Sequence, residues 1–196
     1  GGTPLAGGVA GMNQSSAAQS IYNVRVTGTV TSSDGVYYGL YAGGLVGYNQ
    51  GVIKDTYFSG TVTGGNFTGG LVGYNEVGSQ IDSSYAFATV IGGGGAYHVG
   101  GLVGYLTTSI TNSFAAGTVS GTLFVGGLVG SNVGGTVTDS YYVDDTHGSQ
   151  TGKGAATTLA ALKDQTHAVY STWDFDADGV SAGHNGVWIM AGLPHL

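Results

Sequence analysis

The sequence predicts an all-β protein: a parallel β-helix, or β-solenoid, of about five coils that ends in a small mixed C-terminal cap. Two short sequence blocks alternate along the chain with a shared period, which is typical of solenoids. Both blocks are rich in β-branched and aromatic residues, and glycine supplies 40 of the 196 residues, whereas lysine and arginine together supply 4. This composition favours strands over charged helices.

The first block reads Gly-Gly-Leu-Val-Gly. Full copies occupy residues 43–47, 69–73, 100–104 and 126–130, and a weaker copy, Gly-Gly-Val-Ala-Gly, occupies 7–11. The copies start 26 to 36 residues apart. This spacing is in the range of solenoid coils and is shorter than the roughly 40 residues of a propeller blade.

The second block begins with an aliphatic residue and ends, in its complete copies, in Thr-Val. It reads IYNVRVTGTV at 21–30, IKDTYFSGTV at 53–62, IDSSYAFATV at 81–90 and ITNSFAAGTV at 110–119, and VTDSYYVDDT at 137–146 keeps only the start. Gly, Asn, Ser and Thr bound these runs, as they bound strands. We expect each coil to lay its strands on those of the next, in a right-handed coil, because right-handed crossovers dominate parallel sheets.

Stacked coils bring equivalent side chains to about 4.8 Å from one another. We therefore expect two aliphatic ladders, formed by Leu45, Leu71, Leu102 and Leu128 and by Ile21, Ile53, Ile81, Ile110 and Val137. An amide ladder of Asn13, Asn49, Asn75 and Asn132 is expected at a corner, with an interruption at Leu106.

The Leu-Val pair of the first block leaves open to which face of the strand each side chain points. Neighbours in a strand, such as Leu45 and Val46, point to opposite faces, yet both are apolar. Either a neighbouring segment covers the second face, which we favour, or the second face is an exposed stripe. The stripe would consist of Val46, Val72, Val103 and Val129 with Tyr48, Tyr74 and Tyr105.

The repeat ends near Val143, which divides the chain into repeats at 1–143 and a capping segment at 144–196. Thr158 is a suitable N-cap for a short helix over 158–165, with Leu159 and Leu162 on one face. A compact apolar set follows: Trp173, Phe175, Trp188, Ile189 and Leu193. Since a solenoid needs its open end covered, we interpret this segment as the cap.

These blocks resemble the GLUG-motif proteins. The resemblance rests on GGLVGYN at 43–49 and 69–75, each alternating with a strand of the type Ile-x-x-Ser-Tyr/Phe-Ala-x-Gly-Thr-Val, and on the tail that ends GVWIMAGLPHL. It implies a module of large secreted bacterial proteins, such as haemagglutinin-like adhesins and non-catalytic parts of IgA-specific metallopeptidases. It supplies no catalytic residues and implies a location outside the bacterium or at its surface.

Charge and composition exclude several classes of partner. The net charge of −7 argues against nucleic acid and anionic lipid. No apolar run approaches the length of a membrane span. The chain has no cysteine, which excludes disulfides and thiolate metal sites. No signal peptide is visible at Gly1, so we expect a mature form or an excised segment.

Aromatic residues in the loops before each Gly-Gly-Leu-Val-Gly block are the candidate ligand-binding residues. They are Tyr37, Tyr38, Tyr41, Phe67, Tyr97 and Phe124. Stacked coils would bring these loops to one edge, where rings beside polar groups suit a glycan or a protein. The alternative is that the rings fold back over the coil edges.

Asp174, Asp176 and Asp178, followed by Gly179, match the opening of a calcium loop, and calcium is the one cofactor that the sequence suggests. Asn185 stands where such a loop needs a bidentate carboxylate, so Asx turns are the alternative. The five histidines form no HExxH motif, and no enzyme is predicted.

The leading functional hypothesis is a non-catalytic adhesion or scaffold module that binds a glycan or protein of a host or neighbouring cell. The second is a filament subunit that associates head to tail through the solenoid ends. Two further hypotheses rank lower. Ice binding would use threonine pairs such as Thr61 and Thr63, and polysaccharide cleavage would use carboxylates such as Asp144 and Asp145.

Overall fold

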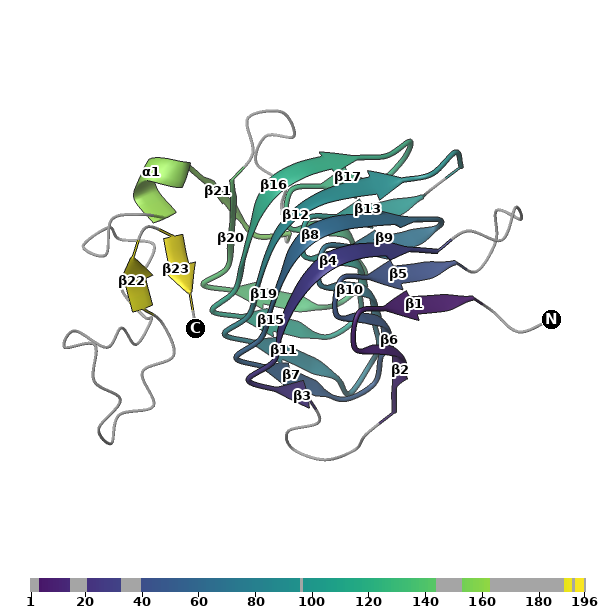
Figure 1. The fold of residues 1–196 in the computed structure, drawn as a ribbon, viewed down its shortest axis with the longest axis horizontal. Helices are drawn as coiled ribbons and strands as arrows, with labels where there is room; N and C mark the ends of the chain where they lie inside the picture. Colours follow the sequence, from purple (N-terminus) through teal and green to yellow (C-terminus); the bar gives the residue numbers. More distant parts are fainter. Residues whose placement is uncertain are drawn as a thin grey trace.

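The protein is a parallel β-solenoid, shown in Figure 1 with the coils stacked from purple to green. The computed structural model describes residues 4–14, 21–32, 40–95, 97–143, 153–162, 189–191 and 193–195. Five coils follow one another, each with four short strands, and equivalent strands pair in parallel into four sheets. The predicted fold class is confirmed.

We name the four sheets A to D in the order in which each coil visits them. Sheet A contains β1 (Leu5–Gly7), β5 (Tyr41–Gly43), β9 (Phe67–Gly69), β13 (His98–Gly100) and β17 (Val125–Gly126). Sheet B contains β2 (Ala10–Asn13), β6 (Val46–Asn49), β10 (Val72–Asn75), β14 (Val103–Leu106) and β18 (Val129–Asn132).

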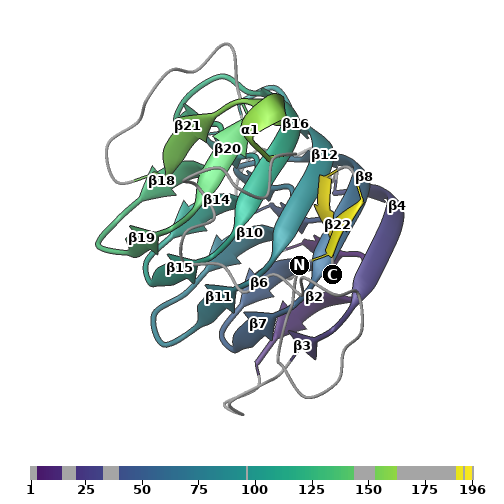
Figure 2. The ribbon, with the colours of Figure 1, turned by 90° about the vertical axis from the view of Figure 1, so that its left-hand side faces the viewer.

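Sheets C and D lie side by side in Figure 2. Sheet C contains β3 (Ile21–Tyr22), β7 (Val52–Lys54), β11 (Gln80–Asp82), β15 (Ser109–Thr111) and β19 (Thr136–Thr138). Sheet D contains the four longest strands, β4 (Arg25–Thr31), β8 (Tyr57–Gly64), β12 (Tyr85–Gly92) and β16 (Phe114–Ser120), followed by the short β20 (Tyr141–Val143) and β21 (Ala155–Thr157).

Both expected aliphatic ladders form the core. The backbone register pairs Ile53 with Ile81 and Ile81 with Ile110, and all three are fully buried. The leucines stack in the same way, since the N–H of Leu71 donates to the carbonyl of Leu102 at 2.9 Å. Each coil therefore buries the same aliphatic positions against its neighbours, which stabilises the fold by roughly 1.5–3 kcal/mol per side chain.

The Leu-Val pair does not lie in one strand. The exposed stripe is wrong, whereas the full burial of Val46, Val72, Val103 and Val129 agrees with the favoured expectation that this position is covered. Leu45 occupies the bend between β5 and β6, and Val46 is the first residue of β6. Because the chain turns between them, the two side chains both enter the core and are fully buried. Strand alternation holds only along a straight strand, so it does not apply across this corner.

The glycines of the first block let sheets A and B touch backbone to backbone. A Cβ atom on Gly73 of sheet B would lie 2.9 Å from the amide nitrogen of Ala42 and 2.8 Å from the carbonyl oxygen of Phe67, both in sheet A. A Cβ on Gly43 would lie 2.1 Å from the carbonyl oxygen of Val46. Any side chain at these positions would separate the two sheets.

Two columns of polar side chains form hydrogen bonds from coil to coil at buried corners. The amide of Asn13 donates to Asn49, and that of Asn49 donates to Asn75, each at 2.7 Å, so the predicted amide ladder forms and stops at Leu106. Between sheets C and D a column of hydroxyl groups repeats one pattern. The N–H of Ser84 donates to the hydroxyl of Ser113 at 3.1 Å, and the hydroxyl of Ser84 donates to the carbonyl of Asp82.

The residue at the corner after each sheet C strand adopts a positive φ. These residues are Asn23, Asp55, Ser83, Asn112 and Asp139, with φ between 45° and 53°. Short polar side chains tolerate this left-handed conformation better than apolar ones. The polar third position of the second block is therefore a corner requirement.

The described part of the C-terminal segment begins on the last coil. β21 pairs with β20, and Gly154 lies against Leu128 of the leucine ladder. Thr158 accepts a hydrogen bond from the N–H of Ala161 at 3.1 Å and caps α1 (Leu159–Leu162), in which Leu162 is fully buried.

The rest of the predicted helix to residue 165, and Trp173, Phe175 and Trp188 of the predicted apolar set, lie outside the described residues. β22 (Ile189–Ala191) and β23 (Leu193–His195) form an antiparallel pair of their own. The role of residues 144–196 as a cap stays a prediction.

The interrupted amide ladder generates a stability prediction. The Asn75 side-chain nitrogen is buried and finds no hydrogen-bond partner among the described residues, and Leu106 is its neighbour in register. Leu106→Asn places an acceptor there and continues the column. We expect the free energy of unfolding to change by less than about 1 kcal/mol, because the new hydrogen bonds offset the lost apolar burial.

Leu102→Asn is the matched control, since it places the same amide in the leucine ladder without a partner. We expect it to cost about 3 kcal/mol or more. Urea denaturation of both variants measures the difference, and equal destabilisation would contradict the role of the amide column.

Candidate binding surfaces

Two columns of aromatic rings run along the solenoid, one on sheet A and one on sheet B. In the sheet A column Tyr41, Phe67, His98 and Phe124 stack with centroid distances of 4.8, 5.0 and 5.2 Å. In the sheet B column Tyr48, Tyr74 and Tyr105 stack at 5.1 and 4.9 Å. Successive planes are within 11° of parallel.

The two columns meet edge to face and form what we call the aromatic seam. Tyr74 lies 5.8 Å from Tyr41 and 5.6 Å from Phe67, with planes near 80° to one another. His98 and Tyr105 meet at 5.0 Å and 82°. Such pairs contribute about 0.5–1.5 kcal/mol each beyond their burial, so the seam fixes the relative position of sheets A and B.

The structure brings three of the predicted loop aromatics to one edge. Tyr41 and Phe67 are half-buried in the seam, and Phe67 has a ring stacked on each face, so these two follow the alternative in which rings pack on the coil edges. Phe124 ends the column and is 58% exposed, and Tyr97 beside His98 is 37% exposed. Tyr37 and Tyr38 lie outside the described residues.

Sequence reasoning missed His98 as a member of the seam and placed the three tyrosines of sheet B on a possible outer stripe. A signal was present, because His98 stands two residues before its Gly-Gly-Leu-Val-Gly block, as Phe67 does before its own. The tyrosines follow the block directly. Only the contact between sheets A and B shows that the two sets meet.

A carboxylate closes one end of the sheet B column. The Tyr48 hydroxyl donates to Glu76, and the side-chain amide of Gln50 donates to the same carboxylate oxygen at 2.6 Å. Burial and the neighbouring Glu76 raise the pKa of Tyr48. The phenol therefore stays protonated and the seam carries no charge at this position.

His98 is the titratable member of the seam. Its Nδ1 lies 2.7 Å from the hydroxyl of Ser131 on the next coil. Burial, followed by the positive charge of Lys153, lowers the pKa of His98 below its ordinary value of 6.5. The neutral imidazole is thus the form that the fold favours.

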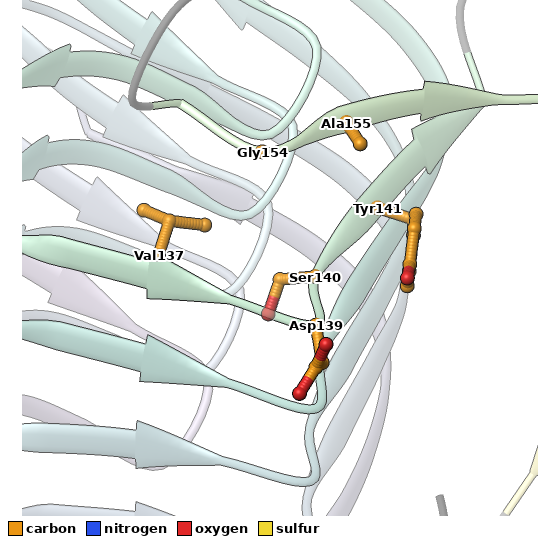
Figure 3. A pocket seen from close by; sticks show the side chains of 6 residues that line it. All are labelled: Val137, Asp139, Ser140, Tyr141, Gly154 and Ala155. Carbon is orange, nitrogen blue, oxygen red and sulfur yellow. The ribbon is translucent and has the colours of Figure 1, made fainter. Parts of the chain in front are cut away.

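A hollow of about 200 Å³ lies at the corner between β19 and β20, where β21 extends only sheet D (Figure 3). Asp139, Ser140 and Tyr141 line it, with Gly154 and Ala155 from the β21 side. Burial and the nearby Asp139 carboxylate raise the pKa of Tyr141. Among the described residues the lining contains one carboxylate, Asp139, whereas acid–base cleavage of a glycosidic bond uses two.

Within the described ranges, no three histidine or acidic side chains gather where they could hold a metal ion. The calcium candidates Asp174, Asp176 and Asp178 lie outside these ranges, as do Asp144 and Asp145, and the calcium site stays a prediction. No helix among the described residues is long and apolar enough to cross a membrane.

The family comparison matches two of the structural coils. The model of the GLUG motif matches residues 38–63 and 95–120. The chain carries GLUG repeats. The first match spans β5 to β8 and the second spans β13 to β16, so one GLUG motif corresponds to one four-strand coil. Each copy brings one ring to each column of the seam.

A longer bacterial protein contains a similar stretch. A Gly-rich membrane protein of Evansella cellulosilytica is 40% identical over 106 residues, which cover 50% of this chain and 12% of that protein. The GLUG coils described here thus span a small part of the length of this relative. No solved structure matches the chain significantly.

The half-buried imidazole of His98 in the seam predicts a pH-dependent stability. The unfolded chain binds a proton near pH 6.5, whereas folded His98 binds it only at lower pH, so stability falls as the pH drops below about 6.5. His98→Phe continues the column with a ring that does not titrate. We expect thermal unfolding midpoints to fall less between pH 7.5 and 5 in this variant than in the wild type.

At neutral pH the variant should lie within about 1 kcal/mol of the wild type, the value of the hydrogen bond to Ser131. Identical pH profiles for the two proteins would show that His98 does not titrate differently on folding.

Proposed function

We propose that this GLUG-repeat chain is a non-catalytic extracellular module of a larger bacterial surface protein, which adheres to glycan or protein through the exposed end of its aromatic seam. The observation that carries the proposal is the contrast between the middle of the seam and its exposed end at Phe124, with Tyr97 beside the seam residue His98. Phe67 and Tyr74 have neighbours on both ring faces, whereas Phe124 and Tyr97 expose much of their surface in adjacent loops.

The seam supports adhesion because it holds these two rings on a rigid base. Phe124 stacks on His98 and has a φ of +46°, an uncommon conformation for a bulky residue, which supports a functional constraint at this position. A preformed aromatic surface loses little conformational entropy on binding. Aromatic rings are also the side chains that most often anchor protein interfaces.

The contacts of Asp82 and Glu76 indicate a structural role for these two carboxylates, which supports a module without turnover. Asp82 pairs with Lys54 at 3.1 Å and accepts hydrogen bonds from Thr111 and Asn112. These partners outweigh burial and lower its pKa. Glu76 is held by Tyr48 and Gln50. Catalytic carboxylates need pKa values matched to proton transfer, and these two carboxylates serve the structure instead.

The location at the bacterial surface rests on the GLUG motif and on the relative. That relative is a bacterial protein named for a membrane, and the matched coils make up a small part of it. A repeat module within a long surface chain suits a stalk or an adhesive segment. The low content of positive charge is compatible with display near other acidic surfaces.

Head-to-tail association is the second candidate function, and one observation favours it. β1, β2, β3 and β4 each pair with a neighbour on one side only among the described residues. Unpaired strand edges are templates for another chain. If they drive assembly, negative-stain electron microscopy at high concentration should show filaments, and light scattering that gives only monomers would contradict this function.

Adhesion through the seam predicts a loss of binding on removal of the exposed rings. We expect Phe124→Asn and Tyr97→Ala each to weaken binding to a hit from a glycan and matrix-protein array by roughly tenfold. Asparagine is chosen at 124 because it tolerates the left-handed backbone. The measurement is biolayer interferometry against that hit.

Val77→Ala is the matched control, since Val77 is 75% exposed in the turn after β10 and belongs to neither column. It should bind as the wild type does. Binding that survives the loss of both rings would overturn the assignment of the seam as the adhesive surface.

A further inference from the structure

The outer face of sheet D presents a row of threonines, in a separate part of the coil from the aromatic seam. The register places Thr29, Thr61, Thr89 and Thr118 side by side on β4, β8, β12 and β16. The hydroxyl of Thr118 lies 3.4 Å from that of Thr89. The strands that carry the row form the face seen in Figure 2.

A depression of about 310 Å³ lies next to this row, floored by Gly60 and Gly117. Gly60 has a φ of +149°, and a Cβ there would lie 1.9 Å from the carbonyl oxygen of Gly28, so no side chain fits. Ser59, Phe87, Thr89 and Thr118 line the depression. Its size is at the lower end of small-molecule sites.

Phe87 stands alone in its column. Its partners in register are Ser59 on β8 and Ala116 on β16, so it has no ring to stack on, unlike the members of the seam. Its side chain is 45% exposed. The ring therefore offers an open apolar surface directly beside hydroxyl groups.

The chemistry of the lining selects the class of ligand. Among the residues that the structure describes, the lining contains no charged side chain, and it combines one aromatic ring with hydroxyl groups that both donate and accept hydrogen bonds. A neutral pyranose has the matching surface, because its C–H groups form an apolar face and its hydroxyl groups radiate from the rim. Anionic sugars would find no cation in the lining and a net charge of −7 on the chain.

The ring of Phe87 favours a sugar over ice as the ligand of this face. β4 and β8 carry the pairs Thr29 with Thr31 and Thr61 with Thr63, but β12 replaces the pattern with Phe87, Thr89 and Ile91. A protruding ring interrupts a flat array of hydroxyl and methyl groups. It does not obstruct a sugar that stacks on it.

We propose that this depression is a binding subsite for one pyranose unit of a neutral polysaccharide. Phe87 stacks on the apolar face of the sugar, and the hydroxyls of Thr89 and Thr118 hydrogen-bond to its hydroxyl groups. The subsite is separate from the aromatic seam and goes beyond the adhesion proposed for the seam.

Isothermal titration calorimetry of the whole chain tests the proposal with cellohexaose, mannohexaose and xylohexaose, and with hexagalacturonate as the anionic comparison. We expect at least one neutral oligosaccharide to bind and hexagalacturonate not to bind. Phe87→Ala should weaken binding by roughly tenfold or more, and Thr89→Val by a few fold, because valine keeps the shape and removes the hydroxyl.

Ile91→Ala is the matched control. Ile91 lies on the same strand and the same face, is 38% exposed and does not line the depression, so its loss should leave binding unchanged. Thermal unfolding of each variant verifies that the fold is intact.

The results separate this subsite from the seam. Loss of oligosaccharide binding in Phe87→Ala but not in Phe124→Asn supports the subsite. Loss in Phe124→Asn alone assigns the sugar to the seam and overturns the subsite. The absence of binding by the wild type to all three neutral hexasaccharides also overturns it, and leaves adhesion of the seam to protein intact.

Discussion

The hydrogen-bond register between coils governs the chemistry of every surface of this solenoid. Each strand pairs with its own equivalent one coil away, so like side chains are held about 4.8 Å apart. Leucines, aromatic rings and asparagine amides gain from that repetition, whereas like charges repel. Charged residues supply only 8% of the chain. Lys54 has Asp82, a residue of opposite charge, at the equivalent position of the next coil, and the two form an ion pair.

The same register explains why glycine rather than a larger residue recurs in the first block. Sheets A and B meet at backbone distance, and one bulky residue at Gly73 of sheet B would push away the backbone of Ala42 and Phe67 in sheet A. Because the position repeats in every coil, such a separation would have to be accommodated along the whole stack. The close contact leaves no room for side chains between the sheets, so the rings of Tyr41 and Tyr48 lie at its margin and interlock there. Tight packing of two sheets thus produces the aromatic seam.

Period and residue type were sufficient to predict the columns, including the ladder of Ile53, Ile81 and Ile110 and the break in the amide ladder at Leu106. They were insufficient at the corners. A rule of alternation assigned Leu45 and Val46 to opposite faces, because nothing in five apolar and glycine residues marks where a strand bends. Contacts between equivalent residues of successive coils follow from the sequence repeat itself. Contacts between different strands of one coil, such as that of Tyr48 with Tyr41, depend on how the corners fold.

In such a fold, the side chains that can bind a partner are those at positions where the sequence repeat is interrupted or ends. A ring in a uniform column, such as Phe67, has both faces covered by its neighbours and contributes stiffness. A ring without an equivalent, such as Phe87, or at the end of a column, such as Phe124, keeps its surface for another molecule. The regular positions of the coils therefore build the scaffold, and the exceptional positions are where chemical specificity for a partner resides.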